Sequence, residues 1–144
     1  MEHSNIKLEE LPEAQRRQME TMLADKFICN LLGIKLTSVG EGTATAELEV
    51  KDIHMNGVGI CQGGVLFSLA DYTLAAAFNH SVEPVVALEV SISYVKSVKG
   101  GKVIAEAREL CRTRTTTAGE VTVRDEQGRI LCLAKGRGYI LQPH

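Results

Sequence analysis

The residues best suited to chemistry lie close together in the segment from Asn56 to Asn79, which begins with glycines and continues as an apolar run. Within that run, from Val65 to Phe78, Asp71 is the only residue with an ionisable carboxyl group. An acidic side chain on an apolar helix is energetically unfavourable unless it is paired or used. Asp71 is therefore a candidate functional residue, and this segment is a candidate active site.

The glycine turn offers a second feature, a set of backbone donors. Gly63 and Gly64 directly precede residues of high helix propensity, so the sequence predicts a helix that opens at this pair. The first amides of a helix lack partners within it and lie at the positive end of its dipole, which suits a developing oxyanion. Asp71 follows about two turns later on the same face. In the alternative interpretation, the glycine pair serves only as a tight connection into the helix. Asp71 would then form a hydrogen bond with a neighbouring backbone group.

Length and composition restrict the class of protein. The 144 residues suit one domain, and the 44 % apolar and 24 % charged residues are typical of a soluble globular protein. The net charge of −2 argues against a nucleic-acid surface or a polybasic membrane anchor. Because no apolar run is long enough to span a membrane and the first residues lack a signal-peptide pattern, we expect a cytoplasmic protein without nucleic-acid or membrane partners.

The cysteines and histidines do not indicate a metal centre. The four cysteines are scattered without ligand spacing, so neither a zinc site nor a disulfide framework is expected. Cys61 lies in the glycine turn, but the local sequence gives it no base, so a half-buried filler is a better interpretation than a nucleophile. For His54 we expect a surface position or a satisfied hydrogen bond, and for His80 a contact with the helix dipole.

The rest of the chain predicts one further helix and a set of strands. Apolar residues three and four apart indicate one amphipathic helix over residues 9–32, ending near Gly33. Alternating residues indicate a hairpin of 34–39 and 43–50. After the central helix, further β-rich runs follow, each joined to the next by a short turn: 85–98, 103–112, 115–123 and 130–141.

Short turns between consecutive strands imply an antiparallel sheet. Because the central helix is apolar nearly all round, the sheet must wrap it rather than cover one side. We therefore expect an α+β fold, with a curved antiparallel sheet around one long helix. A single domain over residues 1–144 would comprise an N-terminal helical segment, 1–33, and a core, 34–144.

This organisation resembles the hotdog-fold acyl-CoA thioesterases, in particular the phenylacetyl-CoA thioesterase-like group. The resemblance covers nearly the whole chain, and its most specific part contains Asn56-Gly57, Cys61, Gly63-Gly64 and the run from Phe67 to Asp71. The family pattern is an Asn-Gly, then a His-Gly-Gly that opens the helix, then an Asp further along that helix.

The resemblance implies hydrolysis of an acyl- or aryl-CoA thioester, with coenzyme A as part of the substrate and no cofactor or metal. The amide of Gly63 or Gly64 would hold the oxyanion, and Asp71 would act as general base or nucleophile. Asn56 of the opposing subunit would position the water or the carboxylate. The resemblance also implies a homodimer with sites between its subunits. Two such dimers could form a homotetramer. An exposed sheet edge, which proteins usually pair or cover, is consistent with that assembly.

Two positions depart from the family pattern. Gln62 replaces the histidine before the glycines, so it can donate a neutral hydrogen bond but cannot become a cation. Ala87 stands where some relatives have a hydroxyl that holds the attacking water, a role for which Thr73 or Ser91 could substitute.

Substrate contacts can also be assigned as expectations. Arg112, Arg114 and Thr115 supply guanidinium and hydroxyl groups that suit coenzyme A phosphates, although a solvated strand edge would look the same. Residues 135–138 are a weaker second choice. Acyl specificity would depend on the apolar side chains along the central helix, namely Val65, Phe67, Leu69, Tyr72 and Phe78, with Thr73 beside them.

Two other functions remain open. An acyl-CoA hydratase or dehydratase usually employs a histidine with its acid, and the glycine turn has none. A non-catalytic acyl-CoA or small-ligand binder would explain Gln62 and Ala87. A pure binder has little reason to bury Asp71, which favours the enzyme.

Overall fold

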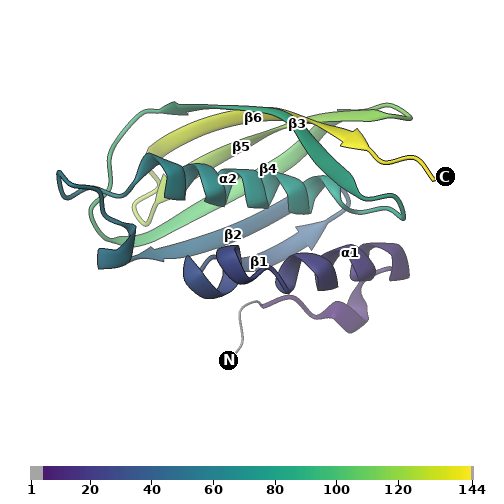
Figure 1. The fold of residues 1–144 in the computed structure, drawn as a ribbon, viewed down its shortest axis with the longest axis horizontal. Helices are drawn as coiled ribbons and strands as arrows, with labels where there is room; N and C mark the ends of the chain where they lie inside the picture. The colour runs from purple at the N-terminus through teal and green to yellow at the C-terminus, as the bar shows by residue number, and fades with distance from the viewer. Residues whose placement is uncertain (1–4, 144) are drawn as a thin grey trace.

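The computed structural model describes residues 5–143, and its centre is a sheet of six antiparallel strands curved around one long helix (Figure 1). The helical elements are η1 (Leu8–Glu10), α1 (Glu13–Leu23), the π-helix η2 (Lys26–Leu31), η3 (Asp52–His54) and α2 (Gly63–Phe78). The strands are β1 (Lys35–Gly40), β2 (Thr43–Val50), β3 (Val85–Tyr94), β4 (Gly101–Arg112), β5 (Thr116–Asp125) and β6 (Ile130–Ile140).

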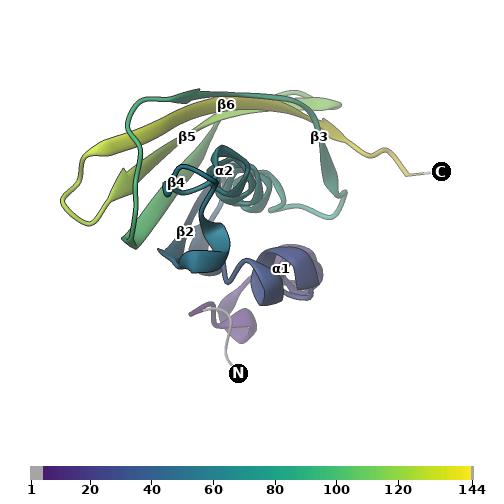
Figure 2. The same ribbon diagram turned by 60° about the vertical axis from the view of Figure 1, so that its left-hand side comes forward.

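The long helix α2 fills the concave side of the sheet, as the sequence predicts. Nine of its sixteen residues are buried, and it contacts all six strands (Figure 2). Burial alternates along β2, β4 and β5, with the buried residues facing this concave side. The expected α+β architecture with a wrapped helix is therefore confirmed.

Glycines in the sheet let the second half of α2 approach closely. A Cβ built at Gly119 would lie 2.9 Å from the Phe78 ring and 3.0 Å from Leu74. The same Cβ would lie 2.5 Å from the carbonyl oxygen of Arg108, which is backbone and cannot yield easily. Gly136 and Gly138 are crowded in the same way by residues of α2 and β3. Larger side chains at these positions would push the helix off the sheet.

The strand order corrects one expectation from the sequence. The order is β1-β2-β4-β5-β6-β3, so β3 and β4 do not form a hairpin. Instead β3 pairs with β6 at the edge, from Val85↔Ile140 to Tyr94↔Cys132. Residues 95–100 then carry the chain back past β6 and β5 to β4, in the middle of the sheet (Figure 2). The connection runs past the glycine turn, where the amide of Cys61 donates to the carbonyl of Val98 at 2.8 Å.

The N-terminal helix is also different from the single helix expected over residues 9–32. It starts after Pro12, stops at Ala24, and restarts as the π-helix η2. Asp25 causes the break, because its Oδ1 accepts the amide of Ile28 at 2.9 Å and caps a new helix. Gly33, at φ +77°, ends the segment where the sequence predicted. The domain limits given above stay a prediction.

No helix within residues 5–143 combines the length and the apolar character that crossing a membrane requires.

Replacing Gly119 by Ala tests the close approach of α2 to the sheet. We expect the free energy of unfolding to fall by about 1–3 kcal/mol, because the added methyl meets backbone and two core side chains. Urea denaturation measures this. The control is Gly100→Ala, since a Cβ at Gly100 has no atom within 4 Å and should change stability little. Equal stability of the two variants would contradict the packing argument.

Candidate active site

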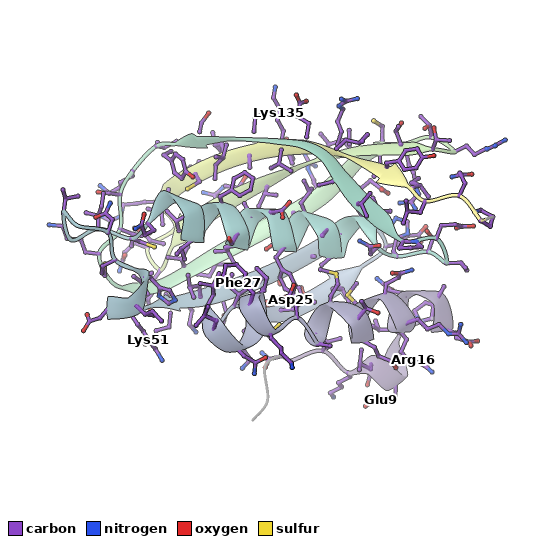
Figure 3. All side chains as sticks on the ribbon, viewed as in Figure 1. Glu9, Arg16, Asp25, Phe27, Lys51 and Lys135 are labelled. Atoms are coloured by element: carbon purple, nitrogen blue, oxygen red, sulfur yellow. The ribbon has the colours of Figure 1, made fainter. Side chains whose placement is uncertain are left out.

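Asp71 lies on the side of α2 that faces the N-terminal helices and the start of the edge strand β3. Its carboxylate is half-buried and makes no hydrogen bond or ion pair within residues 5–143. Burial raises the pKa of this carboxyl group above its ordinary value. It lines a groove of about 490 Å³ between α2 and the N-terminal helices, to which Asp25 and Phe27 also contribute (Figure 3). A desolvated carboxylate without a partner is suited to accept a proton.

The first turn of α2 presents free backbone donors. Gln62 precedes the helix, and its carbonyl accepts the amides of Val65 at 3.1 Å and Leu66 at 3.3 Å. The amides of Gly63 and Gly64 have no acceptor in the described part of the chain. Around Gly64 there is open space, because a Cβ built there would meet no atom within 4 Å. These donors can therefore bind an anionic oxygen.

Tyr94, which the sequence analysis did not single out, holds this turn in place. Its hydroxyl donates to the carbonyl of Gly63 at 2.7 Å, and its ring would lie 3.0 Å from a Cβ at that position. The residue ends β3, so the edge strand fixes the start of α2. No local pattern could identify it, since the contact depends on β3 lying at the edge of the sheet.

Asn56 shapes the loop that leads into the glycine turn. Its Oδ1 accepts the amides of Val58 at 3.0 Å and Ile60 at 3.2 Å, and its own amide donates to the carbonyl of Ile60 at 2.8 Å. The side-chain nitrogen makes no hydrogen bond within residues 5–143. The side-chain NH2 group of Asn56 is thus free to donate to another group. Gln62 is exposed, and its side-chain amide is also unbonded within this region.

In one chain the amide donors and the carboxylate do not meet. Gly64 and Asp71 are separated by seven residues of helix, which is about 10 Å along the axis. A catalytic base acts at about 3 Å from the proton it takes, or through one water. The amides at the start of α2 and the carboxylate of Asp71 are therefore too far apart in one chain to contact the same substrate carbonyl directly.

The residues of α2 that were predicted to contact the substrate differ in whether they reach the groove. Phe67 is half-buried and lines the groove beside Asp71. Tyr72 also borders it, but its hydroxyl donates to the carbonyl of Met22 at 2.9 Å. Thr73 does not reach the groove, which corrects its expected role: it is fully buried and donates to the carbonyl of Leu69 at 2.6 Å.

A small hollow of about 20 Å³ joins Asp71 to the start of β3. Ala87 and Arg137 line it, so Ala87 does lie beside the carboxylate. Neither expected substitute for the missing hydroxyl is there, since Thr73 is in the core and Ser91 lines a separate hollow with Lys135 on the sheet. Figure 3 shows Lys135 pointing away from α2.

Arg112 is held within the protein and does not offer a free phosphate site. Its Nη1 donates to Glu109 Oε2 at 2.8 Å and to the carbonyl of Phe78, the last residue of α2, at 3.1 Å. Its Nη2 donates to Ser81 Oγ at 2.8 Å. The guanidinium thus stabilises the C-terminal end of α2, because it binds the negative end of the helix dipole. Arg114 and Thr115 lie at the adjacent turn, and Arg114 is exposed.

Glu109 is the centre of this network. Burial alone would raise its pKa, but hydrogen bonds from Thr117, His80 and Arg112 together bring the pKa below its ordinary value. Thr117 Oγ1 donates at 2.5 Å, and His80 Nε2 lies 2.9 Å from Oε1. His80 therefore acts near the helix end, as expected, but by way of Glu109.

His54, just before the glycine turn, and Cys61, within it, have structural rather than chemical surroundings. His54 is buried and bonded at both ring nitrogens, to the amide of Lys51 at 2.9 Å and to the carbonyl of Leu32 at 2.8 Å. Cys61 is 4 % exposed, and burial raises the pKa of its thiol, which makes a thiolate nucleophile unfavourable. His54 thus has the satisfied hydrogen bonds that the sequence analysis named as one alternative, whereas Cys61 is buried rather than half-buried.

Comparison with known proteins identifies the family. The model of the thioesterase superfamily matches residues 58–132, more than half of the 144 residues. The chain belongs to the thioesterase superfamily. A protein of Archaeoglobus fulgidus named as a candidate esterase is 35 % identical over 132 residues, covering 88 % of this chain and 86 % of its own. The 1,4-dihydroxy-2-naphthoyl-CoA hydrolase of Listeria monocytogenes is 30 % identical over 107 residues, covering 72 % and 87 %.

A solved structure within the thioesterase superfamily confirms the fold. The acyl-coenzyme A thioesterase PaaI of Escherichia coli is 29 % identical over 109 residues, covering 75 % of this chain and 78 % of its own. The structure of Escherichia coli PaaI superposes with a TM-score of 0.84 at 25 % identity, covering 92 % and 97 %. The expected hotdog fold is confirmed, and membership of the thioesterase superfamily makes the protein a thioester hydrolase.

Replacing Glu109 by Gln tests the network at the end of α2. A carboxyl whose pKa is lowered by folding stabilises the protein above its unfolded pKa of about 4.3, and that stability is lost as the pH falls through the lower folded pKa. At pH 7 we expect Glu109→Gln to lower the free energy of unfolding by about 1–3 kcal/mol, because Arg112 is left without its carboxylate partner. Below pH 4 the difference from wild type should shrink.

Urea denaturation between pH 3 and 7 measures the effect. Glu106→Gln is the matched control, since Glu106 is an exposed glutamate on the same strand. A loss for Glu109→Gln that is independent of pH, or equal in both variants, would contradict the assignment.

Proposed function

We propose that the protein hydrolyses an acyl- or aryl-CoA thioester to the free acid and CoA, with Asp71 as the base. The carrying observation is that α2 presents an unpartnered, half-buried carboxylate and unpaired amides at its start, in a member of the thioesterase superfamily. The names of the relatives, an acyl-CoA thioesterase and a naphthoyl-CoA hydrolase, support CoA thioesters as the substrate class.

In the proposed reaction Asp71 removes a proton from a water, and the hydroxide adds to the thioester carbon. The carbonyl oxygen becomes an oxyanion that accepts hydrogen bonds from the amides of Gly63 and Gly64. When the C–S bond breaks, the CoA thiolate takes the proton from Asp71, and the acid is released. If Asp71 attacks directly instead, it forms a mixed anhydride that water then cleaves. Gln62, unbonded at the same turn, adds a neutral donor to the oxyanion.

The spacing within α2 supports a site shared between two subunits. Because Gly64 and Asp71 of one chain lie about 10 Å apart along the helix, the amides of one subunit would meet the Asp71 of another. The edge strand β3 exposes Val86 and Leu88, and pairing two such edges about a two-fold axis would cover them. The free side-chain nitrogen of Asn56 would then reach the partner's carboxylate or its water. The unit is a homodimer, alone or doubled to a homotetramer.

For the phosphates of coenzyme A, exposed guanidinium groups that are unpaired or only weakly paired are better choices than Arg112. Arg114 is exposed beside Thr115 at the β4–β5 turn, and Arg137 lines the hollow next to Asp71. The bond of Arg137 to Glu89 is a long surface contact of 3.7 Å, which a phosphate can replace. We therefore assign phosphate contact to Arg114, Thr115 and Arg137.

A non-catalytic acyl-CoA binder is the second candidate function. Ala87 favours it, because this residue lines the hollow beside Asp71 and supplies no hydroxyl to hold a water. Binding of acyl-CoA without release of thiol would support this candidate.

Asp71→Asn tests the base. We expect thiol release from a panel of aliphatic and aromatic acyl-CoAs to fall by about 10²–10⁴-fold, the usual contribution of a catalytic base. Asp52→Asn, the same change at an exposed aspartate, should keep wild-type rates. Because burial raises the pKa of Asp71, wild-type kcat/KM should decline with falling pH at a midpoint above the ordinary aspartate value of about 3.9. Full activity of Asp71→Asn would refute the mechanism.

Mixing two inactive variants tests the shared site. Asp71→Asn and Asn56→Ala should each be inactive alone, because each homodimer has two defective sites. A heterodimer would contain one site with an intact Asp71 and an intact Asn56 loop. Random assortment after co-expression should therefore restore about a quarter of wild-type activity. If both catalytic elements came from one chain, no heterodimer site would be complete, and activity would not return.

A further inference from the structure

The hydroxyl of Tyr94 binds a peptide group whose other side carries one of the free amide donors. The acceptor is the carbonyl oxygen of Gly63, at 2.7 Å. The carbonyl of Gly63 and the N–H of Gly64 belong to the same planar peptide group, and in the trans form they point in opposite directions. A bond that fixes the direction of this carbonyl therefore also fixes the direction of the Gly64 N–H.

Two adjacent glycines make such a restraint important. Without a Cβ, Gly63 and Gly64 can adopt more backbone conformations than other residues, so the directions of their amides are poorly defined by the chain itself. The carbonyl of Gln62 already accepts two amides of the first helical turn, which holds the preceding peptide group. Tyr94 restrains the next peptide group from outside the helix, through its hydroxyl and through a ring that would lie 3.0 Å from a Cβ at Gly63.

Tyr94 is itself held by the sheet. It is the last residue of β3 and pairs with Cys132 of β6, and the amide of the next residue, Val95, donates to the carbonyl of Leu131 at 2.8 Å. The hydroxyl is thus supported by a strand end rather than by a loose loop. Desolvation raises the pKa of Tyr94 above its ordinary value, so the hydroxyl stays protonated and can donate at neutral pH.

The same hydrogen bond makes the amide a stronger donor. Hydrogen bonds in a chain polarise one another, so a donor on the carbonyl side of a peptide group strengthens the N–H on its other side. The effect grows as negative charge develops on the oxygen that the N–H contacts, which is the situation of an oxyanion.

We propose that Tyr94 is a positioning residue of the reaction, whose hydroxyl orients and polarises the Gly64 amide through the carbonyl of Gly63. The proposal rests on the proposed function, which assigns the oxyanion to the amides at the start of α2. Tyr94 acts through the peptide group and not by contact with the thioester.

Tyr94→Phe removes the hydroxyl and keeps the ring that packs against Gly63. With the acyl-CoA that the wild type hydrolyses fastest, we expect kcat to fall about two- to tenfold, the scale of one net hydrogen bond realised in the transition state. KM should stay unchanged, because the contact of the amide with the oxygen strengthens only as the charge develops. The melting temperature should stay near wild type, since Tyr94 is 53 % exposed.

Tyr139→Phe is the matched control, because it removes a tyrosine hydroxyl from the far end of the same strand pair. Tyr139 lies seven residues from Cys132 on β6, which is about 23 Å along the strand. Its kcat and KM should equal those of the wild type. An unchanged kcat in Tyr94→Phe, or a raised KM with an unchanged kcat, would overturn the inference while hydrolysis by the wild type upheld the proposed function.

If the wild type hydrolyses no thioester, the proposed function is refuted and ¹⁵N relaxation of the Gly64 amide tests the positioning by itself. The order parameter should be near the rigid value of about 0.85 in the wild type and in Tyr139→Phe, and should fall toward about 0.6 in Tyr94→Phe. A fall in Tyr94→Phe alone would uphold the positioning of the amide. Equal order parameters in the three proteins would refute it.

Discussion

The enclosure of an apolar helix by a curved sheet is the constraint on which the rest of the structure depends. The helix α2 has no polar face of its own, so it is stable only where strands surround it, and nine of its residues are buried. Gly119 permits the close approach of Phe78 and Leu74 to the sheet. Asp71 is the one acidic residue on this helix. It lies in the groove between α2, the start of β3 and the N-terminal helices.

The same packing positions the groups that the proposed reaction uses. Because α2 starts directly after a glycine pair, its first amides have no acceptor, and Tyr94 of the edge strand fixes the turn that carries them. Because Asp71 is half-buried against apolar side chains, its pKa is raised and it can accept a proton. One helix thus carries both unpaired amide donors and an unpartnered carboxylate, and these groups are too far apart in one chain to contact the same carbonyl directly. In the proposed homodimer a symmetry-related chain would remove that separation, since each chain would contribute the group that the other lacks at that site.

The sequence was sufficient for the features that depend on local patterns. The extent of α2, the β1–β2 hairpin and the wrapped sheet follow from periodicity and turn residues, and the thioesterase resemblance follows from the residues around Gly63 and Asp71. It was insufficient where contacts are distant in the chain. The crossing of β3 to the far edge, the capture of Arg112 by Glu109 and the burial of Thr73 all depend on tertiary packing. Asp25 is a residue type that caps helices, but the apolar periodicity continues across it, so the sequence pattern predicted one unbroken helix.

A crystal structure of Asp71→Asn bound to phenylacetyl-CoA would test the central claim most directly. The substitution preserves the shape of the side chain and should slow turnover enough to trap the thioester. The account predicts that the carbonyl oxygen accepts a hydrogen bond from the amide of Gly63 or Gly64 of one subunit. The thioester carbon should then lie within reach of residue 71 of the other subunit. A carbonyl bound away from the start of α2, or a thioester far from residue 71, would contradict it.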